Sequence, residues 1–347
     1  MKKKWMRFVV AALIIVLTLG LLQRILMPKY ATGIVEGALI SEYYDEVFDH
    51  DVIFIGDCEV YETYSPVTLW EEYGIPSWVR GSAQQTVWQS YYLLEEMLRY
   101  ETPKVVVFNV LAMKYDTPES TGSDTRREAY NRMTLDGMKW SQSKWRAISA
   151  SMTEKEEGML TYLFPILRFH DRWRELSRED FKYLFRREAV SHNGYLMRTL
   201  VVPFEGGLPE APPRQFSFGE NSWYYLNQME TLCRERGIRL VLVKAPNPMP
   251  VWWESWEQAI RDYAEEKGLL YLNAQAYQEE IGIDWTRDTY DGGYHLNVYG
   301  AEKTTRWLGE ILLQRCGLPD RRGEQETAAL WAEKTARYEK DKQEAGT

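Results

Sequence analysis

Cysteine is scarce in this chain of 347 residues, which has three: Cys58, Cys233 and Cys316. Three thiols cannot build a disulfide framework, and at most one pair, such as Cys233 with Cys316, is able to bridge. The phosphate-binding fingerprints of nucleotide enzymes are missing. Histidine occurs only at His50, His170, His192 and His295, with no spacing typical of metal ligands. We therefore expect no metal and no cofactor.

Positive charge is also in short supply. The chain has 42 Lys and Arg against 51 Asp and Glu, which gives a formal net charge of -9. An acidic chain repels phosphate backbones, and no long basic patch offsets the repulsion, so we expect no nucleic acid partner. Aromatic residues are plentiful at 14%, with 14 Trp and 23 Tyr. They fit a surface that stacks on sugars, although many of these rings must lie in the core.

Long apolar runs are confined to the N-terminus. The basic start MKKKWMR precedes an apolar run over Phe8–Leu22, which is shorter than the roughly 20 residues that a span prefers. Flanking apolar residues lengthen it if Arg7 and Arg24 extend their charges toward water. A cleaved signal peptide is the alternative, but Tyr30 stands where a cleavage site needs a small residue. We expect residues 1–30 to be an uncleaved single-pass anchor in the cell membrane, with the N-terminus inside and the following domain extracytoplasmic.

Beyond the anchor, strand-like and helix-like segments alternate. The apolar stretch 104–112 is typical of a parallel strand buried on both faces. Ser65 before Pro66, with a closing Gly74, predicts a capped helix. The rhythm is that of a doubly wound, mostly parallel α/β sheet, flavodoxin-like in kind. Expected strands cover 51–57, 75–83, 104–112, 238–246 and 269–274, and expected helices cover 65–74, 86–100, 223–237, 256–268 and 297–317.

The alternation divides the chain into parts. The α/β domain is expected over 31–317, with its rhythm broken at about 116–225 by an insertion rich in Arg, Trp and Tyr. We interpret this insertion as a helical cap over the carboxyl edge of the sheet. The charged tail, 318–347, is expected to be a surface helix or partly disordered.

Polar residues stand where the expected strands end, which is where sites lie in doubly wound sheets. The first strand runs into Gly56-Asp57-Cys58-Glu59, the second into Gly81 and Ser82, and the third ends at Asn109. A glycine-rich loop just before the last helix carries Asp288, Asp291 and His295.

This set resembles the SGNH/GDSL hydrolase superfamily over about 51–115 and 226–315. Those enzymes have a Gly-Asp-Ser nucleophile after the first strand, a glycine and an asparagine of the oxyanion hole after the next two, and an Asp-x-x-His pair before the last helix. Here Cys58 replaces the serine, and Gly81 and Asn109 match the middle blocks. Asp291 and His295 match the last block with three intervening residues instead of two. The resemblance extends to envelope-facing members, similar to the D-alanyl transfer protein of teichoic acids and the acetyltransfer proteins of exopolysaccharides.

Acyl transfer needs a nucleophile, a base that contacts it and donors for the developing oxyanion. Cys58 would be the nucleophile, with His295 as its base. Asp291 would fix the imidazole tautomer, although Asp288 is near enough in sequence to do so instead. The backbone N–H groups of Cys58 and Gly81 and the side-chain amide of Asn109 would bind the oxyanion.

Two functions follow. The first is an anchored esterase or O-acyltransferase for acyl groups of cell-envelope glycans, with an acylated glycan or an acyl donor protein as partner. The second is a catalytically inactive protein of the same fold that binds envelope polysaccharide or assists its assembly. Each site residue also has a bland interpretation: Cys58 as a small buried thiol, His295 and Asn109 as structural groups, and Gly81 as a turn glycine.

Overall fold

The core of the molecule is a sheet of five parallel strands in the order β2-β1-β3-β4-β5. The computed structural model describes residues 2–27, 35–116, 124–152, 158–185, 189–206, 217–248 and 252–345. The strands are β1 (Val52–Gly56), β2 (Ser77–Gly81), β3 (Val105–Asn109), β4 (Arg239–Lys244) and β5 (Leu270–Asn273). This order is that of flavodoxin-like sheets, so the predicted fold class is confirmed.

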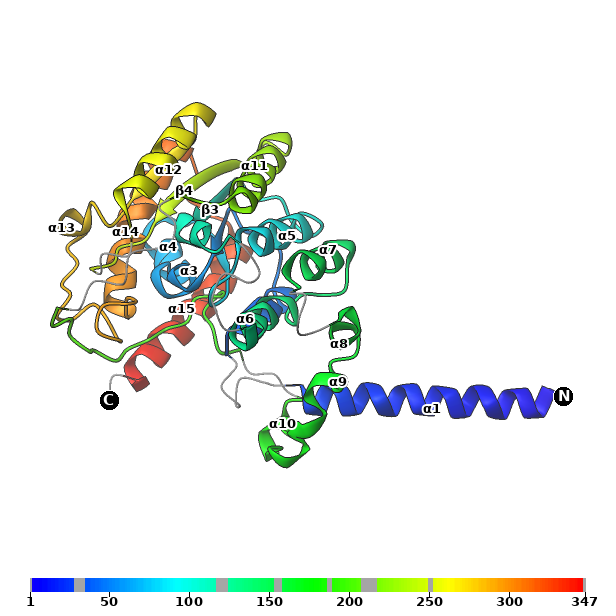
Figure 1. Ribbon diagram of the computed structural model, residues 1–347. Coiled ribbons are helices and arrows are strands. Elements are labelled where there is room, and N and C mark those ends of the chain that lie inside the picture. The colour runs from blue at the N-terminus through cyan, green and yellow to red at the C-terminus, as the bar shows by residue number, and fades with distance from the viewer. Residues whose placement is uncertain are drawn as a thin grey trace.

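The helices cover both faces of the sheet (Figure 1). They are α1 (Lys2–Leu26), α2 (Val35–Glu42), α3 (Cys58–Thr63), α4 (Pro66–Tyr73), α5 (Val87–Met97), α6 (Asp124–Leu135), α7 (Gln142–Ser151), α8 (Met159–Leu163), α9 (Ile166–Phe169), α10 (Arg178–Lys182), α11 (Glu220–Glu235), α12 (Glu254–Lys267), α13 (Gln278–Ile281), α14 (Val298–Cys316) and α15 (Gln325–Ala345). Short 3-10 helices are η2 (Tyr43–Asp45), η3 (Val110–Lys114) and η4 (His170–Arg174).

Alternate residues of each central strand enter two separate hydrophobic cores, as the period of two along a strand requires. On one face, Ile53 of β1 packs with Leu93 of α5 and Leu226 of α11. On the other, Phe54 of β1 packs with Leu69 of α4 and Leu308 of α14. The central strands are therefore covered by apolar packing on both faces.

The predicted caps of α4 are confirmed. The Ser65 side chain accepts a hydrogen bond from the backbone N–H of Thr68, Pro66 is the first helical residue, and Gly74 ends the helix with a φ of 65°. These caps fix where α4 begins and ends after the segment that follows β1.

The insertion, expected at about 116–225 as a cap over the carboxyl edge, has several neighbours. Thr134 of α6 forms a hydrogen bond with Ser82, just after β2, so α6 lies near the carboxyl end of that strand. The helix α7 packs against α5, and α9 and α10 contact α1. Residues 117–123, 153–157, 186–188 and 207–216 of the expected insertion lie outside the described residues.

The charged tail forms α15, which packs against α4. Trp331 stacks on Trp70 with ring centroids 5.3 Å apart, and Tyr338 is buried. The expected surface helix is therefore present, and it contributes to the core through one face.

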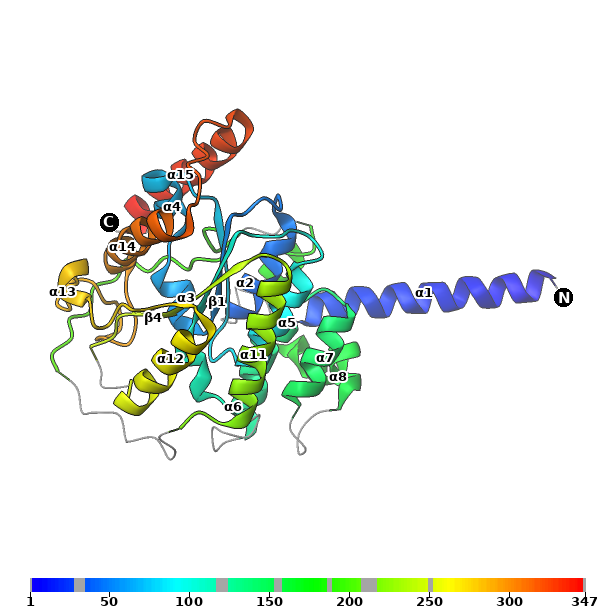
Figure 2. The same ribbon diagram turned by 90° about the horizontal axis from the view of Figure 1, so that it is seen from above.

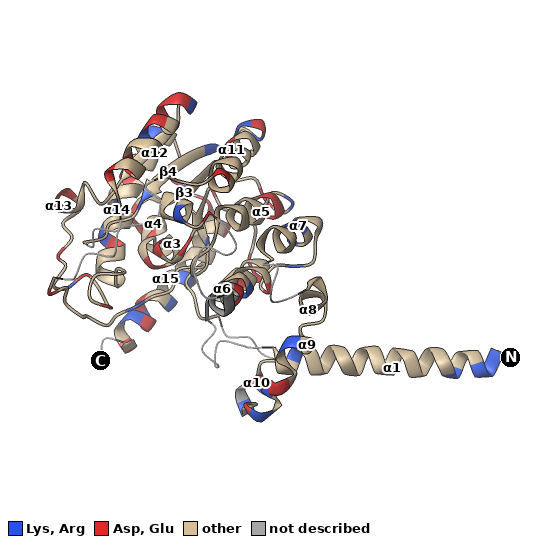
Figure 3. Cartoon of the chain, viewed as in Figure 1, with Lys and Arg blue, Asp and Glu red and all other residues tan. Residues whose placement is uncertain are grey.

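Among the described residues, α1 is the one helix long and apolar enough to cross a membrane by length and composition, a test that a signal sequence also passes. It projects from the rest of the molecule, as Figures 1 and 2 show. Its apolar side chains are exposed. Basic residues mark its first turns (Figure 3). Met1 and residues 28–34, where the expected anchor ends, are outside the described part of the chain.

Candidate active site

The turn between β1 and α3 presents Cys58 at the carboxyl end of the sheet. Asp57 is the N-cap of α3, and its side chain accepts a hydrogen bond from the backbone N–H of Glu59 at 3.3 Å. Cys58 is the first residue of the helix and is partly exposed. Gly56 makes the turn at a φ of 152°, and a Cβ there would lie 2.7 Å from Cγ2 of Val60. The glycine is needed because the helix passes close over the strand end.

His295 is held by Asp291. The Asp291 carboxylate lies 2.6 Å from Nδ1 of His295 through one oxygen and accepts its backbone N–H at 2.8 Å through the other. Asp288 instead bonds Nζ of Lys303 at 2.6 Å and the backbone N–H of Asp284 at 2.7 Å. The structure thus brings Asp291, and not Asp288, to the imidazole.

Cys58 and His295 meet although 237 positions separate them in the sequence. The thiol and the imidazole lie close enough for each to shift the pKa of the other. The order Cys58, His295, Asp291 has the connectivity of a nucleophile, a base and an orienting carboxylate.

Glu62 is a second carboxylate at the imidazole. Its Oε2 lies 3.4 Å from Nε2 of His295. This oxygen is buried and has no hydrogen-bond partner within the part of the chain that the structure describes. Its other oxygen accepts a 2.6 Å hydrogen bond from the Tyr290 hydroxyl, and the Tyr290 ring stacks on His295. Burial raises the pKa of the Glu62 carboxyl. His295 therefore lies between two acids, one of them mostly buried.

A buried charge cluster lies behind the nucleophile. Nζ of Lys244, at the end of β4, lies 2.9 and 3.1 Å from the two carboxylate oxygens of Glu59. The Asn109 amide donates to Glu59 at 2.9 Å and to Asp57 at 3.3 Å. Burial, and next the nearby Glu59, raise the pKa of Asp57 to about 7. Asn109 thus has its amide hydrogens on carboxylates in this structure.

Gly81 lies beside this turn because β2 pairs with β1 in register, with Gly81 opposite Gly56. A Cβ at Gly81 would lie 3.2 Å from the carbonyl oxygens of both Gly56 and Asp57. Glycine therefore lets the end of β2 approach the backbone just before Cys58.

The charges around Cys58 and His295 set the protonation of the pair. Burial, followed by the Asp57 carboxylate, raises the pKa of the Cys58 thiol, and His295 acts in the opposite direction. Burial lowers the pKa of His295, but Cys58, Asp291 and Glu62 outweigh it, so the imidazole pKa is raised. Cys58 and His295 thus each favour the charged form of the other, while burial opposes both charges.

Sequence reasoning missed Glu62 and Lys244. A helix that begins at Cys58 brings residue 62 onto the same side one turn later, which is a signal that the sequence offered. Lys244 ends an otherwise apolar strand, and a charge there falls on the carboxyl edge of the sheet. Glu59, the last residue of the Gly56-Asp57-Cys58-Glu59 stretch, belongs to this buried ion pair with Lys244.

All three cysteines are free thiols, so Cys233 and Cys316 are not bridged. Within the described ranges, no group of three or more His, Cys, Asp or Glu side chains is arranged to hold a metal ion.

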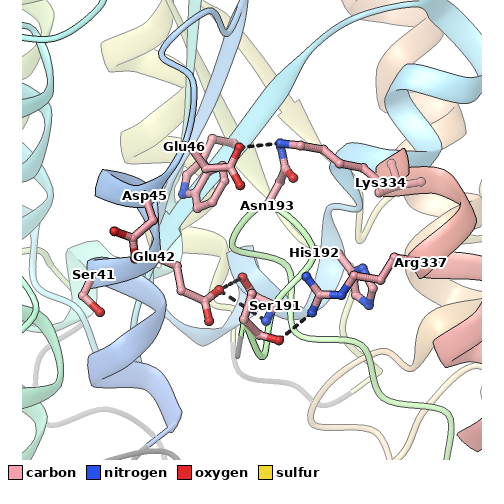
Figure 4. A pocket seen from close by; sticks show the side chains of 12 residues that line it. Ser41, Glu42, Asp45, Glu46, Ser191, His192, Asn193, Lys334 and Arg337 are labelled. Carbon is pink, nitrogen blue, oxygen red and sulfur yellow. Dashed lines mark hydrogen bonds and ion pairs between the residues drawn. The ribbon is translucent and has the colours of Figure 1, made fainter. Parts of the chain in front are cut away.

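Away from these residues, a cavity of about 230 Å³ opens between η2, residues 189–193 and α15 (Figure 4). Several of its charged groups are paired: Glu42 accepts from the backbone N–H of Val190 at 2.7 Å, and Lys334 lies 2.6 Å from Glu46. His192 is buried here beside Asp341, at 3.3 Å, and against the ring of Tyr338. Burial and then Arg337 lower the pKa of His192 to about 4.

This shift predicts a loss of stability in mild acid. The folded-state pKa, about 4, lies below the unfolded value of about 6.5. Above pH 6.5 His192 is neutral in both states. Between pH 6.5 and pH 4, His192 binds a proton in the unfolded chain but stays neutral in the folded chain. The unfolding free energy therefore falls over this range, by on the order of 3 kcal/mol. We expect His192→Gln to flatten the fall in unfolding free energy between pH 7 and 4.5, measured by urea unfolding at each pH. Parallel curves for the two proteins would contradict this assignment.

Comparison with known proteins gives only distant likenesses, all of them to solved structures. No protein-family model matches the chain, and no curated protein matches it. A solved structure of a protein assigned to the G-D-S-L lipolytic family, from Desulfitobacterium hafniense DCB-2, aligns with a TM-score of 0.36 and 12% identity. The alignment covers 76% of this chain and 100% of that one. A likeness at this level carries no argument about activity, which rests on the side chains described above.

Proposed function

We propose that this protein is an SGNH-like ester hydrolase or acyltransferase in which Cys58 is the nucleophile, His295 the proton carrier and Asp291 the orienting acid. One observation carries the proposal. The Cys58 thiol lies near enough to His295 to shift its pKa, and Nδ1 of the same imidazole lies 2.6 Å from the Asp291 carboxylate. An imidazole in this position can exchange a proton with the sulfur while its tautomer stays fixed.

The chemistry takes two balanced steps. The Cys58 thiolate attacks the ester carbonyl, the C–S bond forms, the C–O bond breaks, and the His295 imidazolium gives its proton to the leaving alkoxide. Neutral His295 then takes a proton from water or from a sugar hydroxyl. That oxygen attacks the thioester, the C–S bond breaks, and thiolate and imidazolium are restored. If water attacks the thioester, the overall reaction is ester hydrolysis. If a sugar hydroxyl attacks it, the overall reaction is acyl transfer.

The oxyanion would be bound by the backbone N–H groups of Cys58 and Gly81 and by the Asn109 amide. Because that amide is bonded to Glu59 and Asp57, its participation requires it to turn from one of these carboxylates toward the substrate.

The substrate we propose is a glycan of the cell envelope. In hydrolysis the acylated glycan would be the ester that is cleaved. In transfer the glycan would accept acyl groups from a donor protein. Support comes from α1, whose basic first turns and apolar length fit a single-pass anchor with the domain outside. Residues 1–30 would be this anchor, 31–317 the α/β domain and 318–347 its tail.

A second function is favoured by the electrostatics. Burial and Asp57 oppose a Cys58 thiolate, and the Asn109 amide is occupied by carboxylates. Both observations suit a protein that kept the fold, lost turnover and binds envelope polysaccharide.

Four full-length proteins in detergent distinguish the two functions: wild type, Cys58→Ala, Cys58→Ser and His295→Ala, each assayed for hydrolysis of a small activated acetyl ester. We expect the wild type to turn over and both alanine variants to fall at least about 10³-fold. An inert wild type with an active Cys58→Ser variant would instead indicate a decayed serine site. Equal background hydrolysis by all four proteins would refute the proposal that this protein is an ester hydrolase or acyltransferase.

A further inference from the structure

A second part of the chain, besides α1, has large apolar side chains that are exposed in the structure. We define the collar as residues 158–185, which include α8, α9, η4 and α10. Trp173 is 62% exposed and Phe185 is 91% exposed. The collar's exposed large apolar residues are Leu160, Phe164, Leu167, Trp173, Phe181 and Phe185. Single exposed apolar residues are ordinary on protein surfaces, but several of them in one short segment indicate an interaction surface. We therefore interpret the collar as a surface that contacts another molecule or a membrane.

The collar is fixed to the end of α1. The helices α9 and α10 and the 3-10 helix η4 contact α1, and Figure 1 shows α9 and α10 beside the end of α1 nearest the sheet. The Arg172 guanidinium donates to the backbone carbonyl of Leu26 at 2.7 Å and pairs with Asp180 at 3.1 Å. Both Leu26 and Arg172 are buried. A cation on a terminal helix carbonyl is stabilising, so the two parts are joined by specific contacts.

The length of α1 sets the depth of the collar. Its 25 residues span about 37 Å at the helical rise of about 1.5 Å per residue. The hydrocarbon core of a bilayer is about 30 Å thick. If the lysines at the start of α1 lie in the inner headgroups, its last turn reaches the outer headgroup region. The collar packs at that last turn.

The composition of the collar fits this depth. Aromatic side chains favour the membrane–water interface, and arginine and lysine extend from it to lipid phosphates. Arg174 lies over the Trp173 ring at 5.2 Å, and Arg168 lies over the Phe169 ring at 5.7 Å. Basic and aromatic groups are thus adjacent, although the whole chain is acidic.

We propose that the collar lies in the outer interface of the bilayer, with its exposed aromatic and leucine side chains among the lipids. A bilayer is preferred to a protein partner because α1, if it spans, brings the lipid surface to these residues without any further binding event. The inference rests on the anchored topology of the proposed function. It adds a second attachment, which fixes how the domain is oriented over the membrane.

Site-specific fluorescence in liposomes tests the collar. The full chain is made with Cys58, Cys233 and Cys316 replaced by alanine. Single cysteines are then placed at Trp173, Phe185, Leu13 and Tyr277 and labelled with an environment-sensitive dye. Leu13 lies in α1, and Tyr277 precedes α13, on the side of the molecule away from α1 in both views (Figures 1 and 2). Far-UV circular dichroism checks that each labelled chain is folded.

We expect lipids that carry a quencher just below the headgroup to quench the Trp173 and Phe185 labels severalfold more than the Tyr277 label. Deep quenchers should quench the Leu13 label. If Leu13 is quenched while the collar labels match Tyr277, the collar proposal is overturned and the anchor stands. Unquenched labels at all four sites would overturn both. Collar signals that change with protein density and not with the lipid quencher would overturn the proposal in favour of a second copy of the chain.

Discussion

Replacing Asp291 by asparagine is expected to lower ester turnover by about 10³- to 10⁴-fold, with little change in KM. The carboxylate holds Nδ1 of His295 at 2.6 Å and its backbone N–H at 2.8 Å. An amide of the same shape turns the imidazole to the wrong tautomer and no longer supports its positive charge, which is how such a substitution acts in catalytic triads. Steady-state hydrolysis of the activated acetyl ester by the full chain measures the loss.

Asp288→Asn is the matched control, because Asp288 lies three positions away in the same loop. Its carboxylate bonds Lys303 and the backbone N–H of Asp284, and it is buried. We expect this variant to lose stability while its kcat stays within a few fold of wild type. A greater loss of turnover in Asp288→Asn than in Asp291→Asn would reverse the assignment of the acid.

Lys244→Met is expected to lower the unfolding free energy by about 3–5 kcal/mol, the range found when one partner of a buried ion pair is removed. The side chain of Lys244 is 0% exposed and that of Glu59 is 4% exposed. Without Nζ, the Glu59 carboxylate is left with the Asn109 amide, close to the Asp57 carboxyl. Urea unfolding in detergent, followed by circular dichroism, gives the value.

Two further variants separate charge burial from ordinary packing. Glu59→Gln added to Lys244→Met removes the stranded charge, and we expect it to recover a large part of the loss. Arg306→Met breaks the pair with Glu72, whose side chains are 45% and 44% exposed, and should cost below about 1 kcal/mol. Equal losses in Lys244→Met and Arg306→Met would show that the buried pair contributes no more than an exposed one.

The sheet was predictable because its signals are local. Apolar runs that end in glycine or asparagine gave the strands, and Ser65, Pro66 and Gly74 gave the limits of a helix. Once the strands were in parallel order, their carboxyl ends had to share one edge, which placed Cys58 near Gly81 and Asn109.

The partners of the site side chains were not predictable to the same degree. Asp288 and Asp291 are both near His295 in sequence. Asp288 is removed from the choice by its bonds to Lys303, on the next helix, and to the backbone N–H of Asp284. Glu59 and Asn109 depend on Lys244, more than 130 positions later in the chain. Such choices follow from tertiary contacts, which local patterns do not encode.

The position of the candidate site relative to α1 limits which molecules can reach it. The segment that carries His295 connects α13 to α14, and α13 lies on the side of the molecule away from α1 in both views (Figures 1 and 2). A domain of this size is about 50 Å across. If α1 spans the bilayer, a short lipid-linked ester at the membrane surface cannot bridge that height, whereas a polymer strand that extends outward from the membrane passes within reach of Cys58. The α/β domain would then act as a spacer that selects long substrates over short ones by reach alone.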